Sequence, residues 1–382
     1  MLTIKNRLPL IIFFTLLAAG VASAMNIFSS DFQKRWVELS KNVELLNEYT
    51  TTHPNIKLKG VNVEGLKLDG AIFNGGTFDG VDWKNVSAKG SKYLKVKFIN
   101  CKFSNSRYWN AEFIDVMFED CEFVSTQFLK SKFVNVKIVN CKGIEAEFDE
   151  LKGSELIVEN TVLNDRSSFT GSEIPLVFRN TTLSGVNMMG LSGNHPLTIE
   201  GGILDEVDFY KSHFSTVILR RVWQGEGPVR FNGTTAESIR IEDVDMWRGL
   251  SLAEIHADYI SIKGGKLKTS FSDSVIAKVY AHDVEFYLFS LSEANLPQVT
   301  LTNCIIHSFP MWDGYTDELI VQNSSIGEID GENFKADLVL WDNVTLDGKI
   351  DLTNAQVKDF RPTRLKRGSK LNLITTGSNM RF

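Results

Sequence analysis

The chain has 382 residues, of which 43% are hydrophobic and 23% charged, and its formal net charge is −6. This composition is that of a folded globular protein and excludes a disordered or collagen-like chain, while the acidic balance disfavours non-specific nucleic-acid binding. Phe is unusually frequent, with 26 copies against 8 Tyr and 7 Trp.

Residues 1–24 have the three parts of a secretory signal peptide. Lys5 and Arg7 form a basic segment, residues 8–20 an apolar run, and residues 22–24 a small-x-small cleavage site. The apolar run is too short for a comfortable bilayer span, and no later segment has the length of a membrane-spanning helix. We therefore expect an exported bacterial protein, periplasmic or secreted, with no transmembrane segment in the mature chain. An uncleaved N-terminal anchor is the alternative.

Residues 25–55 are predicted to form an N-terminal capping helix. Ser30 and Gln33 fit a capping box at its start. An apolar stripe of helical spacing follows, and it either covers the end of a core or binds a partner protein; we expect the first. The stripe consists of Phe32, Trp36, Leu39, Val43 and Leu46.

Residues 56–163 carry a five-residue repeat. From Leu58 to Phe148, every fifth position is apolar at 18 of 19 places, and ten of these residues are Phe. A small or aliphatic residue usually comes two positions earlier, and Gly, Asn or Asp often comes two positions later. A period of five fits neither an α-helix nor a simple β-strand, but it fits a chain that turns a corner every five residues. Four sides then close a coil of about 20 residues, and successive coils pair as parallel strands.

These units resemble those of the pentapeptide-repeat family, in which a small residue, a polar residue, a central Leu or Phe and two polar residues follow one another. The clearest matches are CKFSN (101–105), AEFID (111–115), CEFVS (121–125) and SKFVN (131–135). The resemblance implies an all-β fold, a right-handed quadrilateral β-helix. It does not imply one function, because members of the family are diverse. Some members resemble a DNA duplex and protect topoisomerases in the cytoplasm, which does not match an exported chain.

The coil period continues after the five-residue repeat has faded. A unit of apolar-x-apolar-x-Asn/Asp/Gly recurs every 19 to 22 residues, from VKFIN at Val96 to LIVQN at Leu319. We therefore predict that residues 164–360 form an irregular continuation of the β-helix. Segments rich in Gly, Pro and Ser are expected to be loops on the rod. These segments are 164–175, 190–196, 224–228 and 308–317.

Three of the four cysteines, Cys101, Cys121 and Cys141, follow one another at the coil period. We expect them to stack on one inward column, where a spacing of about 4.8 Å is slightly long for a disulfide. Buried free thiols are therefore favoured, with a disulfide as the alternative. Cys304 lies about eight coils further on, and no CxxC pair predicts a zinc or iron–sulfur site.

Polar residues recur at the end of each strand unit. Calcium binding or catalysis would be one interpretation of this column. We favour a structural one, because Asn and Asp tolerate the left-handed backbone of a corner. The column consists of Asn100, Asp120, Asn140, Asn160, Asn180, Asp243, Asp283, Asn303 and Asn323.

The last segment, residues 361–382, is a basic C-terminal tail. It contains six basic residues, namely Arg361, Arg364, Lys366, Arg367, Lys370 and Arg381. Such a tail either attaches to anionic surfaces or forms a solvated end or terminal cap, and we favour the second.

The Phe residues are assigned to the core, so function is sought among Trp, Tyr and Asp residues outside the repeat. The candidate binding residues are Trp247, Trp312, Asp313, Tyr315, Asp317 and Trp341. We expect a non-enzymatic rigid scaffold that binds a protein or glycan partner through the irregular C-terminal half, with no cofactor, metal or nucleic acid. The alternative is a polysaccharide-active β-helix enzyme using Asp243, Asp283 or Asp313. A duplex-mimicking inhibitor of a DNA enzyme is the third hypothesis.

Overall fold

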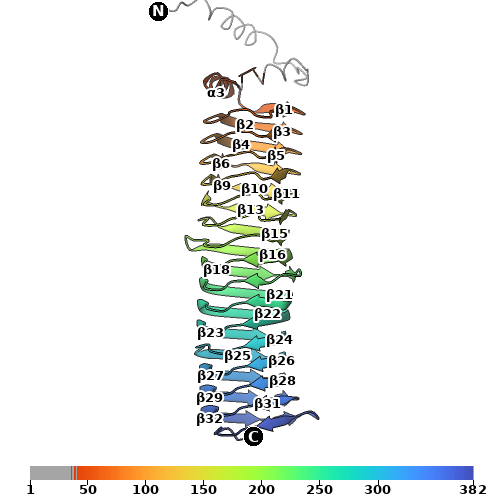
Figure 1. Cartoon of the computed structure of the whole chain (residues 1–382), viewed down its shortest axis with the longest axis vertical. Helices are drawn as coiled ribbons and strands as arrows, with labels where there is room; N and C mark the ends of the chain where they lie inside the picture. Colours follow the sequence, from red (N-terminus) through yellow and green to blue (C-terminus); the bar gives the residue numbers. More distant parts are fainter. Residues whose placement is uncertain (1–35, 37, 40, 382) are drawn as a thin grey trace, which may run out of the picture.

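The computed structural model describes residues 36, 38–39 and 41–381, and Figure 1 shows them as an elongated rod of stacked coils. The 34 strands of this described part belong to one sheet, and about 16 coils follow one another along the rod. A short helix, α3 (Val43–Thr52), lies at one end, and the C-terminus lies at the other. The predicted fold class, a parallel β-helix with a short N-terminal helix, is confirmed.

Two predictions fall on the N-terminal segment. The leader over residues 1–24 and the pair Ser30 and Gln33 lie outside the described residues. Within the part of the chain that is described, no helix has both the length and the apolar character needed to cross a membrane.

The first coils turn at every fifth residue. Positions 100, 105, 110, 115 and 120 all have left-handed backbone, with φ between 50° and 56°. Asn and Asp occupy all five positions and tolerate this geometry better than other residues with a side chain. Because the turns recur at a fixed interval, each residue pairs with its equivalent in the next coil, as Val136 does with Leu156. The predicted four-sided coil is therefore what this part of the sequence forms.

We number the four sides of a coil in chain order. Side 1 contains β10, side 2 contains β11, side 3 contains the residues around Glu147, and side 4 contains β12. The strands of the first coils are β1 (Ile56–Lys59), β2 (Ile72–Asp79), β3 (Asp82–Lys84), β4 (Lys92–Ile99), β5 (Lys102–Ser104), β6 (Glu112–Ile114), β7 (Met117–Glu119), β8 (Glu122–Val124), β9 (Lys132–Val134), β10 (Val136–Val139), β11 (Lys142–Ile144), β12 (Lys152–Gly153), β13 (Leu156–Glu159) and β14 (Val162–Asn164).

The last coils turn at every tenth residue instead. Left-handed residues lie at positions 283, 293, 303, 313, 323, 333 and 343, so each coil keeps two such corners. The strands pass through the other two corners without a left-handed turn, and β27 (Tyr315–Gln322) and β29 (Lys335–Asp342) are accordingly eight residues long. This change explains why the five-residue repeat fades while the coil period persists.

The strands of the middle coils are β15 (Leu176–Ser184), β16 (His195–Asp205), β17 (Val207–Asp208), β18 (His213–Arg220), β19 (Trp223–Gln224), β20 (Val229–Arg230), β21 (Thr235–Ser251) and β22 (His256–Ser270). Those of the last coils are β23 (Val275–His282), β24 (Glu285–Ser290), β25 (Gln298–Thr302), β26 (Ile305–Pro310), β27 (Tyr315–Gln322), β28 (Ser325–Asp330), β29 (Lys335–Asp342), β30 (Thr345–Leu346), β31 (Lys349–Asp351), β32 (Gln356–Thr363), β33 (Lys366–Arg367) and β34 (Asn372–Ile374).

The core is a continuous column of apolar side chains inside the rod. The ten Phe residues of the repeat are all buried. Phe98 and Phe118 of successive coils stack with ring centroids 4.9 Å apart and planes 7° apart, while Phe98 meets Phe103 of the same coil edge-on. Both arrangements are favourable for aromatic pairs, so one residue type fills a narrow square interior.

Helix α3 covers the first coil. Leu46 is fully buried, and the Asn47 side chain accepts a hydrogen bond from the Ile72 amide (2.7 Å) and donates one to the Gly70 carbonyl (3.1 Å). It thereby pairs backbone groups at the open edge of the coil. The apolar stripe is interrupted, because Asn42 lies outside the helix and its side chain accepts a hydrogen bond from the Leu45 amide. The stripe residue Phe32 lies outside the described residues.

The four predicted loops are tight turns and strand ends rather than protrusions. In segment 308–317, residues 308–310 belong to β26 and residues 315–317 to β27, with buried Met311 in the turn between them. The prediction failed because Gly and Pro are needed as much in close corners as in long loops. The other segments contain irregularities of one or two residues, as where Val207 pairs with Val229 across 22 positions.

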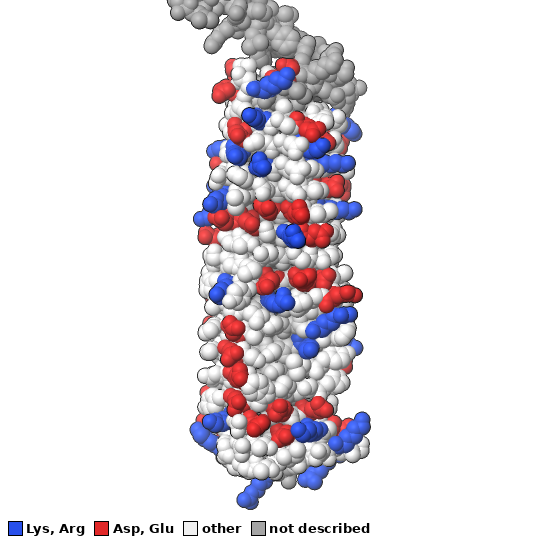
Figure 2. Space-filling model, in the orientation of Figure 1, with Lys and Arg blue, Asp and Glu red and all other residues white. Residues whose placement is uncertain are grey.

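Residues 361–381 belong to the last coil of the rod. The strands β32, β33 and β34 pair with β29, β30 and β31 of the coil before. Figure 2 shows Lys and Arg side chains gathered around this end. The basic segment therefore ends the solenoid, and its charges lie on the surface of a folded coil.

All four cysteines are buried free thiols, and three of them stack as expected. The Cys121 amide donates a hydrogen bond to Sγ of Cys141, one coil away, at 3.2 Å. Burial raises the pKa of the Cys121 thiol, and it raises that of Cys304 to about 11. The thiols act as small core residues.

Candidate binding surface

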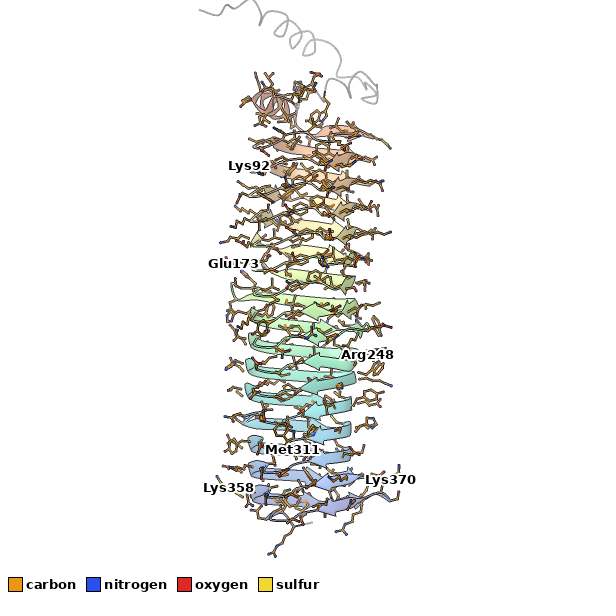
Figure 3. All side chains as sticks on the ribbon, in the orientation of Figure 1. Lys92, Glu173, Arg248, Met311, Lys358 and Lys370 are labelled. Carbon is orange, nitrogen blue, oxygen red and sulfur yellow. The ribbon has the colours of Figure 1, made fainter. Side chains whose placement is uncertain are left out.

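The six residues proposed as a binding site do not come together. Trp247 lies on side 2, in β21, with 48% of its surface exposed. Tyr315 and Asp317 lie on side 4, in β27, where the Tyr315 hydroxyl donates a hydrogen bond of 2.6 Å to Asp317. This bond to a carboxylate stabilises the neutral phenol and raises the pKa of Tyr315 to about 12. In Figure 3, Arg248 beside Trp247 and Lys358 on side 4 lie at opposite edges of the rod.

The other three residues have structural positions. Trp312 and Asp313 lie in the turn between β26 and β27, and Asp313 is a left-handed corner residue with φ 53°. The assignment of Trp341 to a surface was wrong, because this side chain is fully buried in β29. Position 341 follows buried Val321 by one coil, so the period of the chain already places it inside.

The carboxylates of the alternative enzyme hypothesis do not form a pair. Asp243 and Asp283 occupy the same corner column, with the coil of Gly264 between them, and Asp313 lies at a different corner. The whole polar column interpreted as corner residues has left-handed backbone, with φ between 49° and 58°. Its structural interpretation is confirmed, and neighbours such as Asn303 and Asp283 hydrogen-bond at 3.1 Å.

Exposed apolar side chains concentrate on side 2. Ten large apolar residues are exposed in the described part of the chain, and the strand registers place seven of them on this side. They occupy two neighbouring outward columns, two residues apart along each strand. The seven residues are Ile144, Val162, Ile203, Trp223, Trp247, Tyr287 and Ile305. We call them the side-2 strip.

A bulge brings Trp247 to the surface. Between Met246 and Leu250, β21 contains three residues where the next strand, β22, contains one. The Gln224 side chain holds the bulge: its oxygen accepts hydrogen bonds from the amides of Arg248 (3.1 Å) and Gly249 (3.0 Å), and its nitrogen donates to the Gly249 carbonyl (2.8 Å). The Arg248 guanidinium lies over the Trp247 ring, 4.8 Å from its centroid.

A second irregularity places Tyr287 beside Trp247. Strand β24 contains one extra residue, Tyr287, opposite the step from Leu267 to Lys268 in β22. The Tyr287 ring lies 6.3 Å from that of Trp247 and stacks on the ring of His307 at 5.4 Å. The rings therefore form a row along the rod, and each covers part of its neighbour.

Charged side chains accompany this row. Glu285 contacts Nε2 of His307 at 3.1 Å and Nζ of Lys266 at 3.4 Å. The hydrogen bond with His307, followed by the charge of Lys266, lowers the pKa of Glu285. Asp245 occupies the neighbouring position on the coil before Lys266. Side 2 therefore carries the charged residues Asp245, Lys266 and Glu285 between apolar residues of the side-2 strip.

Of the side-2 strip, only Trp247 was proposed from the sequence. Ile203, Trp223 and Ile305 lie two residues after a corner residue, at the column position of Lys142 and Val162. The coil period could therefore have assigned them to one column. Gln224 and Tyr287 could not be found in this way, because their roles depend on strand irregularities of one to three residues.

Comparisons with known proteins add the following findings. No family model matches the chain, and no curated protein matches it. Among solved structures it is similar to QnrB1, a plasmid-mediated fluoroquinolone resistance protein, at 16% identity over 58% of this chain and 83% of that one, with a TM-score of 0.20. It is also similar to HetL, a pentapeptide repeat protein involved in heterocyst differentiation regulation from the cyanobacterium Nostoc, at 9% identity over 74% and 92%, with a TM-score of 0.17. Neither likeness transfers a function to this chain.

The sequence repeat and the fold agree with each other. Small-x-Phe units turn at a left-handed fifth residue, and their coils stack through parallel strands around a column of Phe rings. This construction is the stacked-coil β-solenoid that the resemblance of the repeat to the pentapeptide-repeat family implies.

Proposed function

We propose that the protein is a rigid, non-enzymatic scaffold that binds a protein partner along side 2. The observation that carries the proposal is the side-2 strip, which holds seven of the ten large exposed apolar residues of the described chain. A concentration of this kind on one face marks an interaction surface, whereas isolated apolar residues do not. Trp and Tyr are also the residue types most often found at the centres of protein interfaces.

A protein partner is favoured over a glycan by the packing of the rings. Sugars bind to the open flat face of an aromatic ring. Here Arg248 covers Trp247, and Tyr287 and His307 stack on each other. The aliphatic residues Ile203 and Ile305 extend the same surface, and such residues pack well against protein side chains.

We also propose that the protein is exported. The basic, apolar and small-x-small parts of residues 1–24 support this. N-terminal sequencing of the protein purified from a bacterial envelope fraction should begin at Met25. A chain that retains Met1 in the cytoplasm would contradict export without affecting the proposed surface.

Substitution of the exposed tryptophans tests the binding proposal. Trp223→Ala with Trp247→Ala should abolish retention of the partners that the wild-type protein retains, because both side chains are about half exposed on side 2. Retained proteins would be identified, purified and tested again for direct binding. Val275→Ala and Tyr315→Ala are matched controls, since these side chains are exposed on side 4 and should leave binding unchanged. Equal loss with both pairs, or with neither, would contradict the proposal.

A further inference from the structure

Side 2 carries an outward column of residues whose two halves complement each other. Six successive coils place Ile203, Trp223, Asp245, Lys266, Glu285 and Ile305 directly above one another in one outward column. The column has an apolar residue at each end and opposite charges at its centre. If the column is rotated by 180° so that its two ends exchange, Ile203 and Ile305 take each other's places. At the centre, Asp245 and Lys266 exchange places as well.

We infer that the protein partner on side 2 is a second copy of this chain, packed antiparallel. The two-fold axis lies in the interface between the two copies, at right angles to the rods and level with the gap between the coils of Asp245 and Lys266. This inference rests on the proposed function. In a two-fold dimer every contact occurs twice: if residue i of the first copy contacts residue j of the second, then residue j of the first copy contacts residue i of the second. Here Ile203 faces Ile305 of the second copy, and Asp245 faces Lys266 of the second copy.

The remaining pair of the column is Trp223 with Glu285 of the second copy. Glu285 already contacts Lys266 and His307 of its own chain, so its charge is balanced before the two copies meet. Trp223 also carries an indole N–H, which is a hydrogen-bond donor suited to a carboxylate. This pair is therefore compatible with the antiparallel arrangement.

The neighbouring column has the same complementarity. Asp205 lies on the coil of Ile203, and His307 lies on the coil of Ile305, so an acid again faces a base. Gly225, on the coil of Trp223, faces Tyr287 of the second copy, so a position without a side chain meets a protruding ring. Trp247 lies in the three-residue bulge of β21 and faces β22 of the second copy. Strand β22 has only one residue at the equivalent place, so it leaves room for the bulge.

A parallel arrangement lacks these matches. A two-fold axis along the rod brings each coil against the same coil of its partner and exchanges the two columns. Ile203 would then face Asp205, and Ile305 would face His307. Ile has no hydrogen-bonding side-chain group, so burying a carboxylate or an imidazole against it costs free energy, whereas the Trp223 indole N–H can donate to Glu285 in the antiparallel arrangement. The antiparallel arrangement is therefore favoured.

The surface is large enough for a stable dimer. Uncharged residues continue the column on both sides: Val162 faces Thr345 and Thr182 faces Ser325 of the second copy. Ten coils at about 4.8 Å and a side of five residues at about 3.3 Å each give about 790 Å² per copy. Standard interfaces bury about 800 Å² per partner.

Exchange of the central charges tests the arrangement. We expect sedimentation velocity to show a dimer for the wild type and a monomer for Asp245→Lys or Lys266→Asp alone, because each substitution places like charges opposite each other. The double variant should be dimeric again, and an equimolar mixture of the two single variants should form a heterodimer. Lys335→Asp on side 4 is the control and should stay dimeric. Circular dichroism establishes that every variant remains folded.

Cysteine cross-linking gives a second measurement, because the four native thiols are buried. Under mild oxidation, a mixture of Ile203→Cys and Ile305→Cys should form a covalent dimer, whereas each variant alone should not. A monomeric wild type, or cross-linking of either variant with itself, would overturn the inference. If the wild type is monomeric but the tryptophan substitutions still abolish binding of another protein, the proposed function stands and only the second copy is excluded.

Discussion

The residue that turns each corner has the same backbone geometry throughout the rod. Asn303 is an example from the last coils: its φ is 56°, and its side chain donates a hydrogen bond of 3.1 Å to Asp283 one coil away. Asn tolerates this geometry because its short polar side chain can hydrogen-bond locally, whereas a β-branched residue clashes with its own backbone. The ladder of Asn and Asp therefore stabilises the corner.

Substitution of this corner residue should show the cost directly. We expect Asn303→Val to lower the free energy of unfolding by about 1–2 kcal/mol, because the left-handed backbone then carries a β-branched side chain. Asn303→Gly should have a smaller effect, since Gly adopts positive φ without strain. Thermal melting followed by circular dichroism measures both. Equal melting temperatures for the two variants would contradict the corner interpretation.

The core thiols should be inert in the folded protein. Burial raises the pKa of Cys304 to about 11, so its thiol stays protonated at neutral pH and the reactive thiolate forms only as the pH approaches that value. Because all four cysteines are buried, we expect a thiol reagent at pH 7.5 to modify none of them until the protein is denatured, and then to modify all four. Fewer than four thiols in non-reducing denaturant would indicate a disulfide instead.

At the level of strands and coils, the sequence predicted the features that repeat along the chain. It did not predict the strand irregularities that depart from the repeat. The coil, its corners and the Phe column all follow from positions that are one side or one full coil apart. Trp341 was misassigned because its spacing from Val321 was not used. The bulge at Trp247 and the extra residue Tyr287 could not be predicted, since either strand alone fits the apolar pattern and only the register between neighbouring coils reveals the extra residues.

The bulge depends on one side chain. We expect Gln224→Ala to release residues 247–249, because the amides of Arg248 and Gly249 lose their acceptor. Loss of these hydrogen bonds should cost about 1–3 kcal/mol. Trp fluorescence should shift to the red, and binding on side 2 should weaken. Gln224→Glu keeps the acceptor and is expected to be intermediate; an Ala variant with wild-type fluorescence would show that the bulge is held by other contacts.

For the whole molecule, stability should be a sum over coils, because each coil contacts mainly its neighbours. Removing residues 121–140 deletes one complete coil and joins Asp120 to Cys141, which continues the chain at the equivalent position of the next coil. We expect this variant to fold with a somewhat lower melting temperature. Removing residues 121–135 instead deletes only three of the four sides. It would place side 1 where side 2 belongs and should prevent folding of the adjoining coils.

A deletion within the paired region separates the fold from the symmetry. Removing residues 284–303 joins Asp283 to Cys304 and again deletes one complete coil, so this rod should also fold. However, it removes Glu285 from the six-residue column. Ile305 then lies one coil from Lys266, whereas Ile203 still lies two coils from Asp245. The antiparallel match is lost at one end, and we expect a monomer in sedimentation velocity. The deletion of 121–140 lies outside the column and should remain dimeric. If both deletions left the dimer intact, the interface would have to lie elsewhere on the rod.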